Sequence, residues 1–278
     1  MNYLSIGIPV YNEAAHIKAA ISSLQAQTWT DFKAIISDNC STDETFDICV
    51  DAIRGDSRFH LVRHPRNMGA VYNFEYVMRV ADSNYFLWLG AHDFLSELYL
   101  ERLMALLNRT PSAPMAFGRL VVVKADGVRV DRTANSVYRF SENPLNRFLE
   151  SVAKLSDCSI IHSVFRKSLL DGFQFRPVIS IDHVMLSTLL WHGNVAYDDE
   201  ATYFRREPQG RAIEQPEEQM QRITGAGRTV SRHEFVRCYL DAFEHLYPGD
   251  PRIRESLNTQ IVRVLAARFG ETCVLPPM

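Results

Sequence analysis

Two neighbouring side chains that can ligate a cation follow an apolar run in the first third of the chain. Residues 85–89 are apolar or aromatic, and Gly90 and Ala91 separate them from His92 and Asp93. A buried strand that ends in polar groups is how an open α/β sheet presents chemistry at its carboxyl edge. His92 and Asp93 therefore either hold a metal ion or merely complete the end of a strand.

Three earlier apolar runs also end in polar side chains, and segments with helical spacing separate all four runs. This alternation of strand and helix at βαβ spacing predicts a parallel, doubly wound sheet. The polar strand ends should then lie along one edge, where such sheets bind ligands. The expected strands cover residues 3–10, 33–37, 59–63 and 85–89, and the expected helices cover 14–27, 41–53 and 67–80.

Two of these helices begin near residues with capping chemistry. Asn12 is a plausible N-cap for the first helix, with Glu13 next to it. Ser41 and Glu44 have the spacing of a capping box before the second helix. Both side chains are therefore expected to bind backbone N–H groups of the helix that follows.

The chain after residue 94 has a less regular pattern. Asp126 and Gly127 are typical of a β-hairpin turn, and helical periodicity returns near the C-terminus. A segment rich in Gln, Glu and Gly, residues 207–227, predicts a mobile loop. The other expected helices are 95–107, 145–155, 181–191, 232–246 and 251–269, and the other expected strands are 115–124, 128–132, 159–165, 194–197 and 201–204.

Composition excludes several classes of function and predicts the cellular location. The chain has 278 residues and a formal net charge of −3, so no global field attracts it to nucleic acid or to anionic membranes. We find no apolar run near the ~18–20 residues of a membrane helix and no signal peptide at the N-terminus. The five cysteines are scattered without a C-x-x-C pair. A cytoplasmic protein with reduced thiols and no cysteine-based metal site is therefore expected.

The first strand ends in Pro9 and Tyr11, where a dinucleotide-binding turn needs glycines for close backbone approach to a pyrophosphate. The Walker-type phosphate loop is absent as well. The sequence therefore argues against NAD-dependent and P-loop nucleotide binding at this sheet edge.

The strand ends resemble four motifs of the family 2 glycosyltransferases, in order and spacing. Residues 9–13 (Pro-Val-Tyr-Asn-Glu) resemble the opening motif, and residues 37–43 (Ser-Asp-Asn-Cys-Ser-Thr-Asp) resemble the motif after the second strand. Residues 67–69 (Asn-Met-Gly) followed by Asn73 match the third motif, and residues 85–93 fall at the aspartate-rich metal motif. The resemblance covers residues 1–110 well and 155–206 more loosely.

The resemblance implies a GT-A-type fold, an α/β doubly wound mixed sheet flanked by helices, with a C-terminal helical extension. It implies a glycosyltransferase domain over residues 1–206, divided into a nucleotide-binding half (1–110) and an acceptor half (111–206). Residues 207–278 would form a loop and the helical extension.

The activity implied is transfer of a sugar from a nucleotide diphosphate sugar, with a UDP-sugar favoured, to an acceptor hydroxyl. Inversion and a role in surface polysaccharide synthesis are implied by the family alone. The expected partners are the donor and a saccharide or lipid-linked saccharide acceptor, without nucleic acid. A lipid-linked acceptor would be met peripherally at the inner membrane face, through the C-terminal helices.

By the same resemblance, one set of residues is expected at the nucleotide. The Tyr11 ring can stack on a base, and the Asp38 carboxylate can accept a hydrogen bond from a base imide. Arg205, or its neighbour Arg206, could offset the charge of the leaving diphosphate. Strand-end packing or simple solvation are the alternatives for these residues. The expected nucleotide-site residues are Pro9, Tyr11, Glu13, Asp38, Asn39, Asn67, Gly69, Asn73 and Arg205.

The fourth motif departs from the family pattern, because Gly90 and His92 stand where carboxylates are usual. Asp93 is expected to bind a divalent cation, Mn²⁺ or Mg²⁺, with His92 beside it. Mg²⁺ strongly prefers oxygen ligands, and imidazole suits Mn²⁺ better. The alternative is that metal binding is weak or absent.

The catalytic base is expected at the start of the helix from residue 181. A carboxylate there can take the proton of the attacking hydroxyl, and Asp182 matches that position, with His183 as a second candidate. Ile181 replaces a second acid that the family usually has. Asp182 could instead be a plain helix cap.

Three other functions remain alternatives. The first is a degenerate, non-catalytic nucleotide-sugar-binding protein, suggested by the carboxylates missing at Gly90 and Ile181. A sugar nucleotidyltransferase would need a glycine-rich basic first loop, and a flavodoxin-like signalling domain would not need the long 110–206 region.

Overall fold

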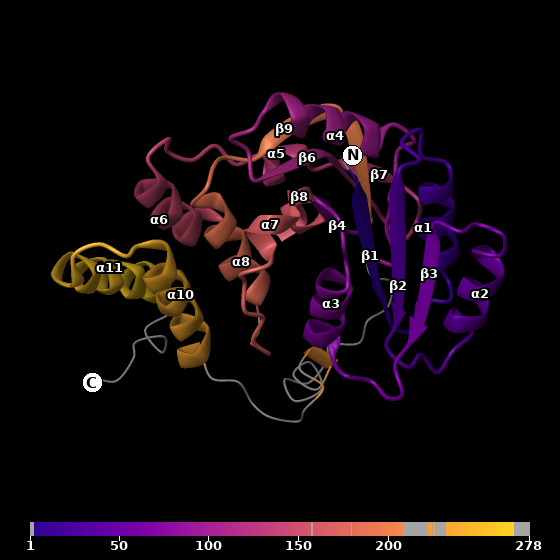
Figure 1. The fold of residues 1–278 in the computed structure, drawn as a ribbon, viewed down its shortest axis with the longest axis horizontal. Coiled ribbons are helices and arrows are strands. Elements are labelled where there is room, and N and C mark those ends of the chain that lie inside the picture. Colours follow the sequence, from indigo (N-terminus) through magenta and orange to yellow (C-terminus); the bar gives the residue numbers. More distant parts are fainter. Residues whose placement is uncertain are drawn as a thin grey trace.

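A mixed sheet forms the centre of the molecule in a computed structural model, which describes residues 3–156, 158–178, 180–207, 222–223, 225 and 232–269 (Figure 1). Within these residues the sheet has nine strands in the order β3-β2-β1-β4-β8-β6-β9-β5, with β7 beside β6. The strands are β1 (Leu4–Val10), β2 (Phe32–Asp38), β3 (Phe59–Arg63), β4 (Tyr85–Trp88), β5 (Phe94–Leu95), β6 (Met115–Val123), β7 (Arg129–Asp131), β8 (Val164–Arg166) and β9 (Ala196–Arg206).

The first four strands are parallel, as the βαβ spacing predicts. β1 pairs with β2 and β4, and β2 pairs with β3. Val10 lies opposite Asp38 in this register, so the first two strands end level with each other. Antiparallel β8 then joins β4 to β6 and makes the sheet mixed. The expected doubly wound mixed sheet is therefore confirmed.

Helices cover both faces of the parallel strands. α1 (Ile17–Gln25) packs with α2 (Thr45–Ala52), and α3 (Ala70–Arg79) packs on β1 and β2. Figure 1 shows α3 on one side of these strands and α2 on the other. Because both faces are covered, β1 reads as a continuous apolar run, which is typical of buried parallel strands.

Glycine at position 7 allows α3 to approach the sheet closely. A Cβ at Gly7 would lie 2.5 Å from Val77 Cγ2 of α3 and 2.8 Å from the Phe86 ring of β4. Both side chains are fully buried. The missing side chain therefore sets the distance between the helix and the sheet.

Two predictions of strands in the second half of the chain were wrong. The strand expected over 159–165 is instead the 3₁₀ helix η1 (Cys158–His162) followed by short β8. The two strands expected over 194–204 are one strand, β9, whose pairing with β6 shifts between Gly118 and Arg119. At this bulge the Asp198 carboxylate accepts hydrogen bonds from Arg102 Nε (2.9 Å) and from the Glu200 backbone N–H (3.0 Å). The polar run between the two apolar segments is thus accommodated without ending the strand.

The two capping predictions were wrong. The side chain of Asn12 caps no helix, because α1 begins at Ile17, with His16 at the N-cap. Ser41 makes no capping box, since α2 begins at Thr45, and the Thr45 backbone N–H donates to the Asp43 carboxylate (3.1 Å). Both residues instead bind across the sheet edge, where more distant partners are available.

The C-terminal helices share a core with α6 and α8. α10 (Arg232–Leu246) packs on α8 (Ile181–Leu190), and α11 (Pro251–Phe269) packs on α6 (Pro144–Lys154), as Figure 1 shows. The Phe243 ring of α10 lies 5.4 Å from Phe148 of α6 and 6.2 Å from Trp191. Further helices among the described residues are α4 (Tyr99–Arg109), α5 (Thr133–Ser136) and α7 (Lys167–Leu170).

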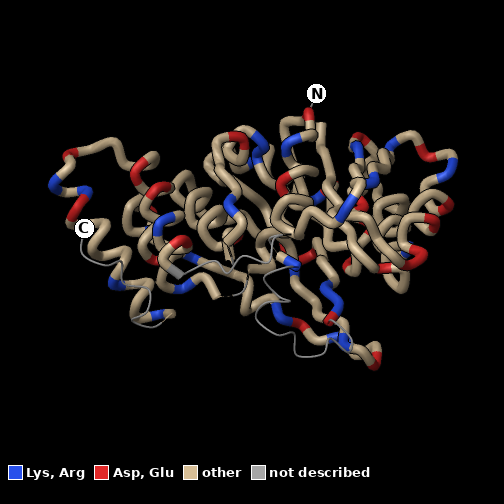
Figure 2. The backbone as a smooth tube through the Cα atoms, turned by 90° about the horizontal axis from the view of Figure 1, so that it is seen from below, with Lys and Arg blue, Asp and Glu red and all other residues tan. Residues whose placement is uncertain are grey.

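Positively and negatively charged residues are interspersed along the described backbone (Figure 2). None of the helices within the described residues is both long and apolar enough to span a bilayer. The loop predicted over 207–227 lies almost entirely outside the described residues.

We expect Gly7→Ala to lower the free energy of unfolding by about 1–3 kcal/mol, because the added methyl overpacks the contact between α3 and the sheet. Urea unfolding measures this change. Gly172→Ala is the matched control, since no described atom lies within 4 Å of a Cβ at that position. An equal effect of the two substitutions would contradict the close approach of α3.

Candidate active site

A cleft of about 600 Å³ opens at the carboxyl edge of the sheet. Its walls come from the loop after β1 and from the residues that follow β4 and end β9. β9 runs parallel to β4 through the pairings of β8 and β6, so both strands end at this edge. The lining residues are Tyr11, Asn12, Glu13, Ala14, Ala15, His16, Asp43, His92, Arg206 and Glu207. Three residues expected from the sequence, Tyr11, Glu13 and His92, therefore line one cleft.

The loop after β1 is clipped to the loop after β2. Asn12 has a left-handed backbone (φ 53°), and its N–H donates to Ser41 Oγ (3.0 Å). The Asn12 side-chain oxygen accepts the Thr42 backbone N–H (2.9 Å). These contacts hold the turn while the Tyr11 ring remains 37% exposed. The ring is thus available to a ligand in the cleft.

Asp38 lies beneath the sheet edge rather than on the cleft wall. Its carboxylate is fully buried, accepts the Ser41 backbone N–H (3.2 Å) and lies 3.2 Å from Arg63 Nε. Pro9 is half-buried within β1 and does not line the cleft either. In this conformation both residues support the loops that face the cleft.

The third motif forms a network of amide hydrogen bonds between β2 and the loop before α3. Asn39 Nδ2 donates to Asn67 Oδ1 (2.9 Å), and Asn39 Oδ1 accepts the Met68 backbone N–H (2.8 Å). Asn67 Oδ1 also accepts the Gly69 N–H (2.9 Å), and Gly69 has a φ of 88° at the start of α3. The amide groups of this loop are therefore satisfied within the protein.

Asn73 has the same supporting character. Its Nδ2 donates to the Ser37 carbonyl (2.9 Å), and its Oδ1 accepts the Ser37 hydroxyl (2.6 Å). The side chain is 2% exposed. Asn73 therefore ties α3 to β2 and has no surface in the cleft.

Asp93 joins β4 to β9 inside the protein. Its carboxylate is 1% exposed; Oδ2 accepts the Tyr203 hydroxyl (2.6 Å), and Oδ1 accepts the Arg206 backbone N–H (2.8 Å). Burial, and then the charge of Asp93, hold the pKa of Tyr203 well above its usual value. Tyr203 consequently remains a donor to the carboxylate. We name this arrangement of Asp93, Tyr203 and Arg206 the Asp93 clasp.

The glycine at position 90 is required by this clasp. A Cβ at Gly90 would overlap Asp93 Oδ2 and lie 3.1 Å from Asp93 Cγ. A carboxylate at position 90 and the inward orientation of Asp93 are therefore sterically incompatible. The inward orientation of Asp93 is therefore a physical reason for glycine, instead of aspartate, at position 90.

His162, to which the sequence assigned no role, supports the clasp from behind. Its ring stacks on Tyr203 with 4.6 Å between centroids, and its Nδ1 lies 2.8 Å from the Trp88 carbonyl oxygen. Desolvation lowers the pKa of His162, so the neutral ring donates through Nδ1 to that carbonyl.

The exposed part of the fourth motif is His92. Its Nδ1 lies 3.3 Å from Glu13 Oε1, and its Nε2 lies 3.6 Å from Asp93 Oδ1. Its carbonyl oxygen accepts a hydrogen bond from Arg206 Nη1 (2.6 Å). A carboxylate, an imidazole and a guanidinium therefore meet at one side of the cleft.

Arg206 is held in place by an aromatic ring. Its guanidinium lies 4.6 Å from the Phe94 ring centroid, and Phe94 stacks on Phe204 with a centroid distance of 4.6 Å. Burial lowers the pKa of Arg206, while the Asp93 charge opposes this effect. A partly desolvated cation in a fixed position binds an anion more strongly than a solvated one.

Arg205, the arginine favoured from the sequence, lies on the other side of β9. Its Nη1 donates to Ser159 Oγ (2.5 Å), and it lines an open hollow of about 430 Å³ with Asn135, Ser156 and Cys158. Successive strand residues face opposite ways. This alternation, once the end of β9 is known, identifies Arg206 as the cleft arginine.

Asp182 lies in the first turn of α8 and is not its N-cap. That position belongs to Ser180, whose φ is 62°. Ligand atoms of Asp182, His183 and Cys158 all lie within 4.8 Å of one another, and all three side chains are half-buried. The predicted base, Asp182, therefore lies close to its sequence neighbour His183 and to Cys158, which is distant in the sequence.

Of the carboxylates that line the cleft, Glu13 lies beside His92, with 3.3 Å between its Oε1 and His92 Nδ1, so this pair can offer a cation one oxygen and one nitrogen ligand. Asp93 already accepts two hydrogen bonds and does not line the cleft. This donor set fits a Mn²⁺-class ion better than Mg²⁺, because imidazole is a poor ligand for Mg²⁺. Glu13 and His92 are thus the residues that fit a cation here.

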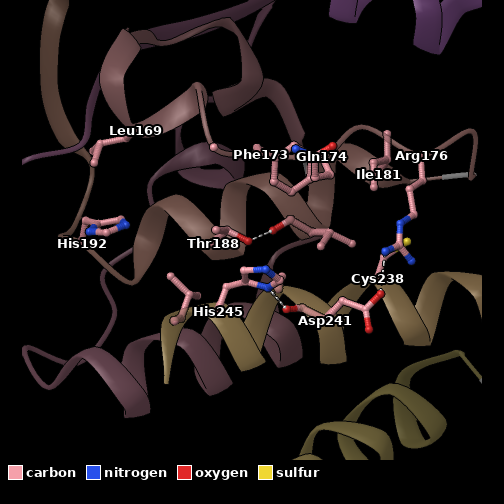
Figure 3. Close-up of a pocket in the computed structure, with 14 residues that line it drawn as sticks. Leu169, Phe173, Gln174, Arg176, Ile181, Thr188, His192, Cys238, Asp241 and His245 are labelled. Carbon is pink, nitrogen blue, oxygen red and sulfur yellow. Dashed lines mark hydrogen bonds and ion pairs between the residues drawn. The ribbon is translucent and has the colours of Figure 1, made fainter. Parts of the chain in front are cut away.

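A second cavity, of about 320 Å³, lies between α8 and α10, away from the strand ends (Figure 3). Its lining is mainly apolar. Arg176 is paired with Asp241 (2.6 Å), and His245 Nδ1 donates to the Asp241 carbonyl (2.7 Å). These polar groups are engaged with each other, so the arrangement at the strand ends is the better candidate for chemistry.

The chain is similar to proteins of known family. It matches Glycosyl transferase family 2 over residues 5–172. It is 25% identical to the teichoic acid poly(glycerol phosphate) polymerase of Staphylococcus epidermidis, over 98% of this chain and 37% of that protein. It is 27% identical to the GalNAc(5)-diNAcBac-PP-undecaprenol beta-1,3-glucosyltransferase of Campylobacter jejuni, over 63% of this chain and 55% of that protein. The chain thus spans little more than a third to about half of these two relatives.

Structural similarity supports the fold. The structure of S. aureus TarS 1-349 in complex with UDP-GlcNAc superposes with a TM-score of 0.65 at 15% identity, over 95% of this chain and 73% of that chain. The family match covers more than half of the sequence, and its motifs surround the cleft. The chain belongs to glycosyl transferase family 2.

Proposed function

We propose that this chain transfers a sugar from a nucleoside diphosphate sugar, with UDP-sugars favoured, to an acceptor hydroxyl with inversion. The observation that carries the proposal is the single cleft that gathers Tyr11, Glu13, His92 and Arg206 at the ends of three strands. Its volume of about 600 Å³ is in the range of ligand pockets. The TarS neighbour, whose structure contains UDP-GlcNAc, supports the choice of donor class.

The donor would be held at its base and at its diphosphate. The exposed Tyr11 ring would stack on the base, and Arg206 would bind the diphosphate. Asp38, Pro9, Asn39, Asn67, Gly69 and Asn73 would act through the loops that they hold, unless nucleotide binding exposes them. Arg205 would act on the acceptor side.

The reaction would be a direct displacement. The acceptor oxygen attacks the anomeric carbon, its proton passes to the Asp182 carboxylate, and the bond from the anomeric carbon to the phosphate oxygen breaks with its electron pair leaving on the nucleoside diphosphate. Arg206 stabilises the negative charge that develops there. The fixed guanidinium needs little reorganisation during this step.

A divalent cation, when bound, would neutralise part of the diphosphate charge. Glu13 and His92 would hold it, in place of the usual pair of carboxylates. Mn²⁺ is favoured over Mg²⁺ by the imidazole ligand.

The setting proposed is synthesis of a cell-surface polymer. The teichoic acid polymerase and the undecaprenol-linked glucosyltransferase among the relatives support it. A saccharide or lipid-linked saccharide is the proposed acceptor, met at the membrane inner face in the second case.

We expect one nucleoside diphosphate, UDP first, to raise the melting temperature, because binding to the native state adds about 2.7 kcal/mol at 100 times the dissociation constant. A panel of nucleoside diphosphates with Mn²⁺, with Mg²⁺ and with chelator measures this shift. His92→Ala and Glu13→Gln should remove the cation-dependent part. The absence of a shift with every nucleotide would overturn the proposed function.

Arg206→Ala should weaken nucleoside diphosphate binding by about 10–100-fold, since a hydrogen bond to a charged group contributes about 1.5–3 kcal/mol. Titration calorimetry measures the affinity. The control is Arg205→Ala, which removes the same charge on the opposite side of β9. A larger loss of affinity in Arg205→Ala than in Arg206→Ala would identify Arg205 as the residue that binds the diphosphate.

Asp182→Asn should slow sugar transfer by about 10²–10⁴-fold through loss of the general base, with nucleotide affinity unchanged. Asp199→Asn, which changes an exposed carboxylate on β9, is the matched control. If the parent chain binds nucleotide sugars but transfers or hydrolyses none, the non-catalytic binder becomes the better interpretation.

A further inference from the structure

We propose that Cys158, Asp182 and His183 form a site for a borderline-soft divalent cation of the Zn²⁺ class, and that a cation there blocks the catalytic base. The proposed effect on transfer rests on the proposed function, whereas cation binding does not. This site is separate from the Glu13 and His92 ligands in the cleft.

The ligand set has the chemistry of a zinc site. A thiolate, an imidazole and a carboxylate are the three kinds of ligand that Zn²⁺ takes, and three protein ligands leave a fourth position open for water. Within the described residues, this is the group of three His, Cys, Asp or Glu side chains with spacing suited to a metal ion. The thiol makes the site unsuitable for Mg²⁺, which requires oxygen ligands.

The spacing needs only a small adjustment. The three ligand atoms lie within 4.8 Å of one another, whereas ligands on one tetrahedral Zn²⁺ lie roughly 3.3–3.8 Å apart, given bonds of about 2.0–2.3 Å. Side-chain rotation at half-buried positions can supply this difference. Cys158 begins η1 and the other two residues open α8, and η1 packs directly on α8.

An entry path to the site is present. Cys158 lines the open hollow of about 430 Å³ that it shares with Arg205, Asn135 and Ser156. An ion can therefore reach the thiol from solvent without unfolding of the helices.

Binding would have two chemical consequences. The Cys158 S–H bond breaks as the sulfur–metal bond forms, and the proton goes to solvent, so binding releases about one proton per chain near neutral pH. The Asp182 carboxylate becomes a metal ligand and can no longer accept the proton of the acceptor hydroxyl. Zinc would thus act as an inhibitor that competes with the base function.

The test uses Co²⁺ as a spectroscopic probe on the full chain freed of metal by chelator. We expect about one equivalent of Co²⁺ to produce a thiolate-to-metal charge-transfer band, which Zn²⁺ then displaces and Mg²⁺ does not. Cys158→Ser should abolish the band, and Asp182→Asn and His183→Gln should weaken it. Cys40→Ser is the matched control, because Cys40 is also half-buried at the sheet edge.

The effect on transfer is measured as the ratio of rates with and without Zn²⁺ within each variant. Saturating Zn²⁺ should slow the parent chain by about 10²–10⁴-fold, toward the rate of Asp182→Asn, and this ratio should approach one in Cys158→Ser. His92→Ala should retain the charge-transfer band, since the cleft ligands are not involved.

Absence of the band, or its loss in Cys40→Ser but not in Cys158→Ser, would overturn the site. A band without any effect of Zn²⁺ on transfer would overturn the inhibition. A chain that shows the band but neither binds nor transfers a nucleotide sugar would overturn the proposed function and leave the cation site intact.

Discussion

The Asp93 clasp is the interaction on which the site depends. A carboxylate that is 1% exposed accepts hydrogen bonds from Tyr203 and from the backbone of Arg206, and so joins the end of β4 to the end of β9. An unsatisfied buried carboxylate would be costly, and these two donors offset that cost. The same contacts place Arg206 beside His92. Asp93, which stands in the metal motif, thus positions the Arg206 guanidinium beside the cleft.

The carboxyl edge divides its polar residues into two groups. Asp38, Asn39 and Asn73 are almost completely buried and hold the loops by hydrogen bonds within the protein. Tyr11 and Glu13, from the loop after β1, and His92, which follows β4, line the cleft instead. The loop of Tyr11 and Glu13 depends on the buried group, because Asp38 holds the Ser41 backbone and Ser41 Oγ accepts the Asn12 backbone N–H. Residues of one motif therefore serve two different purposes, support and ligand contact.

Much of the fold could be predicted from the sequence. The alternation of apolar strands and amphipathic helices over the first 90 residues identified β1 to β4 and their common edge, because hydrophobic periodicity is a local property of the chain. The errors lie where distant partners compete. Asn12 and Ser41 have capping chemistry, but each finds a hydrogen-bond partner across the sheet edge. The bulge in β9 depends likewise on Arg102 of α4, which binds Asp198.

The sequence by itself determined the family, the alternation of strands and helices over the first 90 residues and the edge where the polar residues gather, since these follow from motifs and periodicity. Only the tertiary structure decided which polar side chains face the cleft. It turned Asp93 inward over Gly90, placed Arg206 rather than Arg205 beside His92, and brought Cys158 to Asp182 and His183. The physical reason is that the direction of a side chain at a strand or helix end is set by partners from other segments, and sequence spacing does not record those partners.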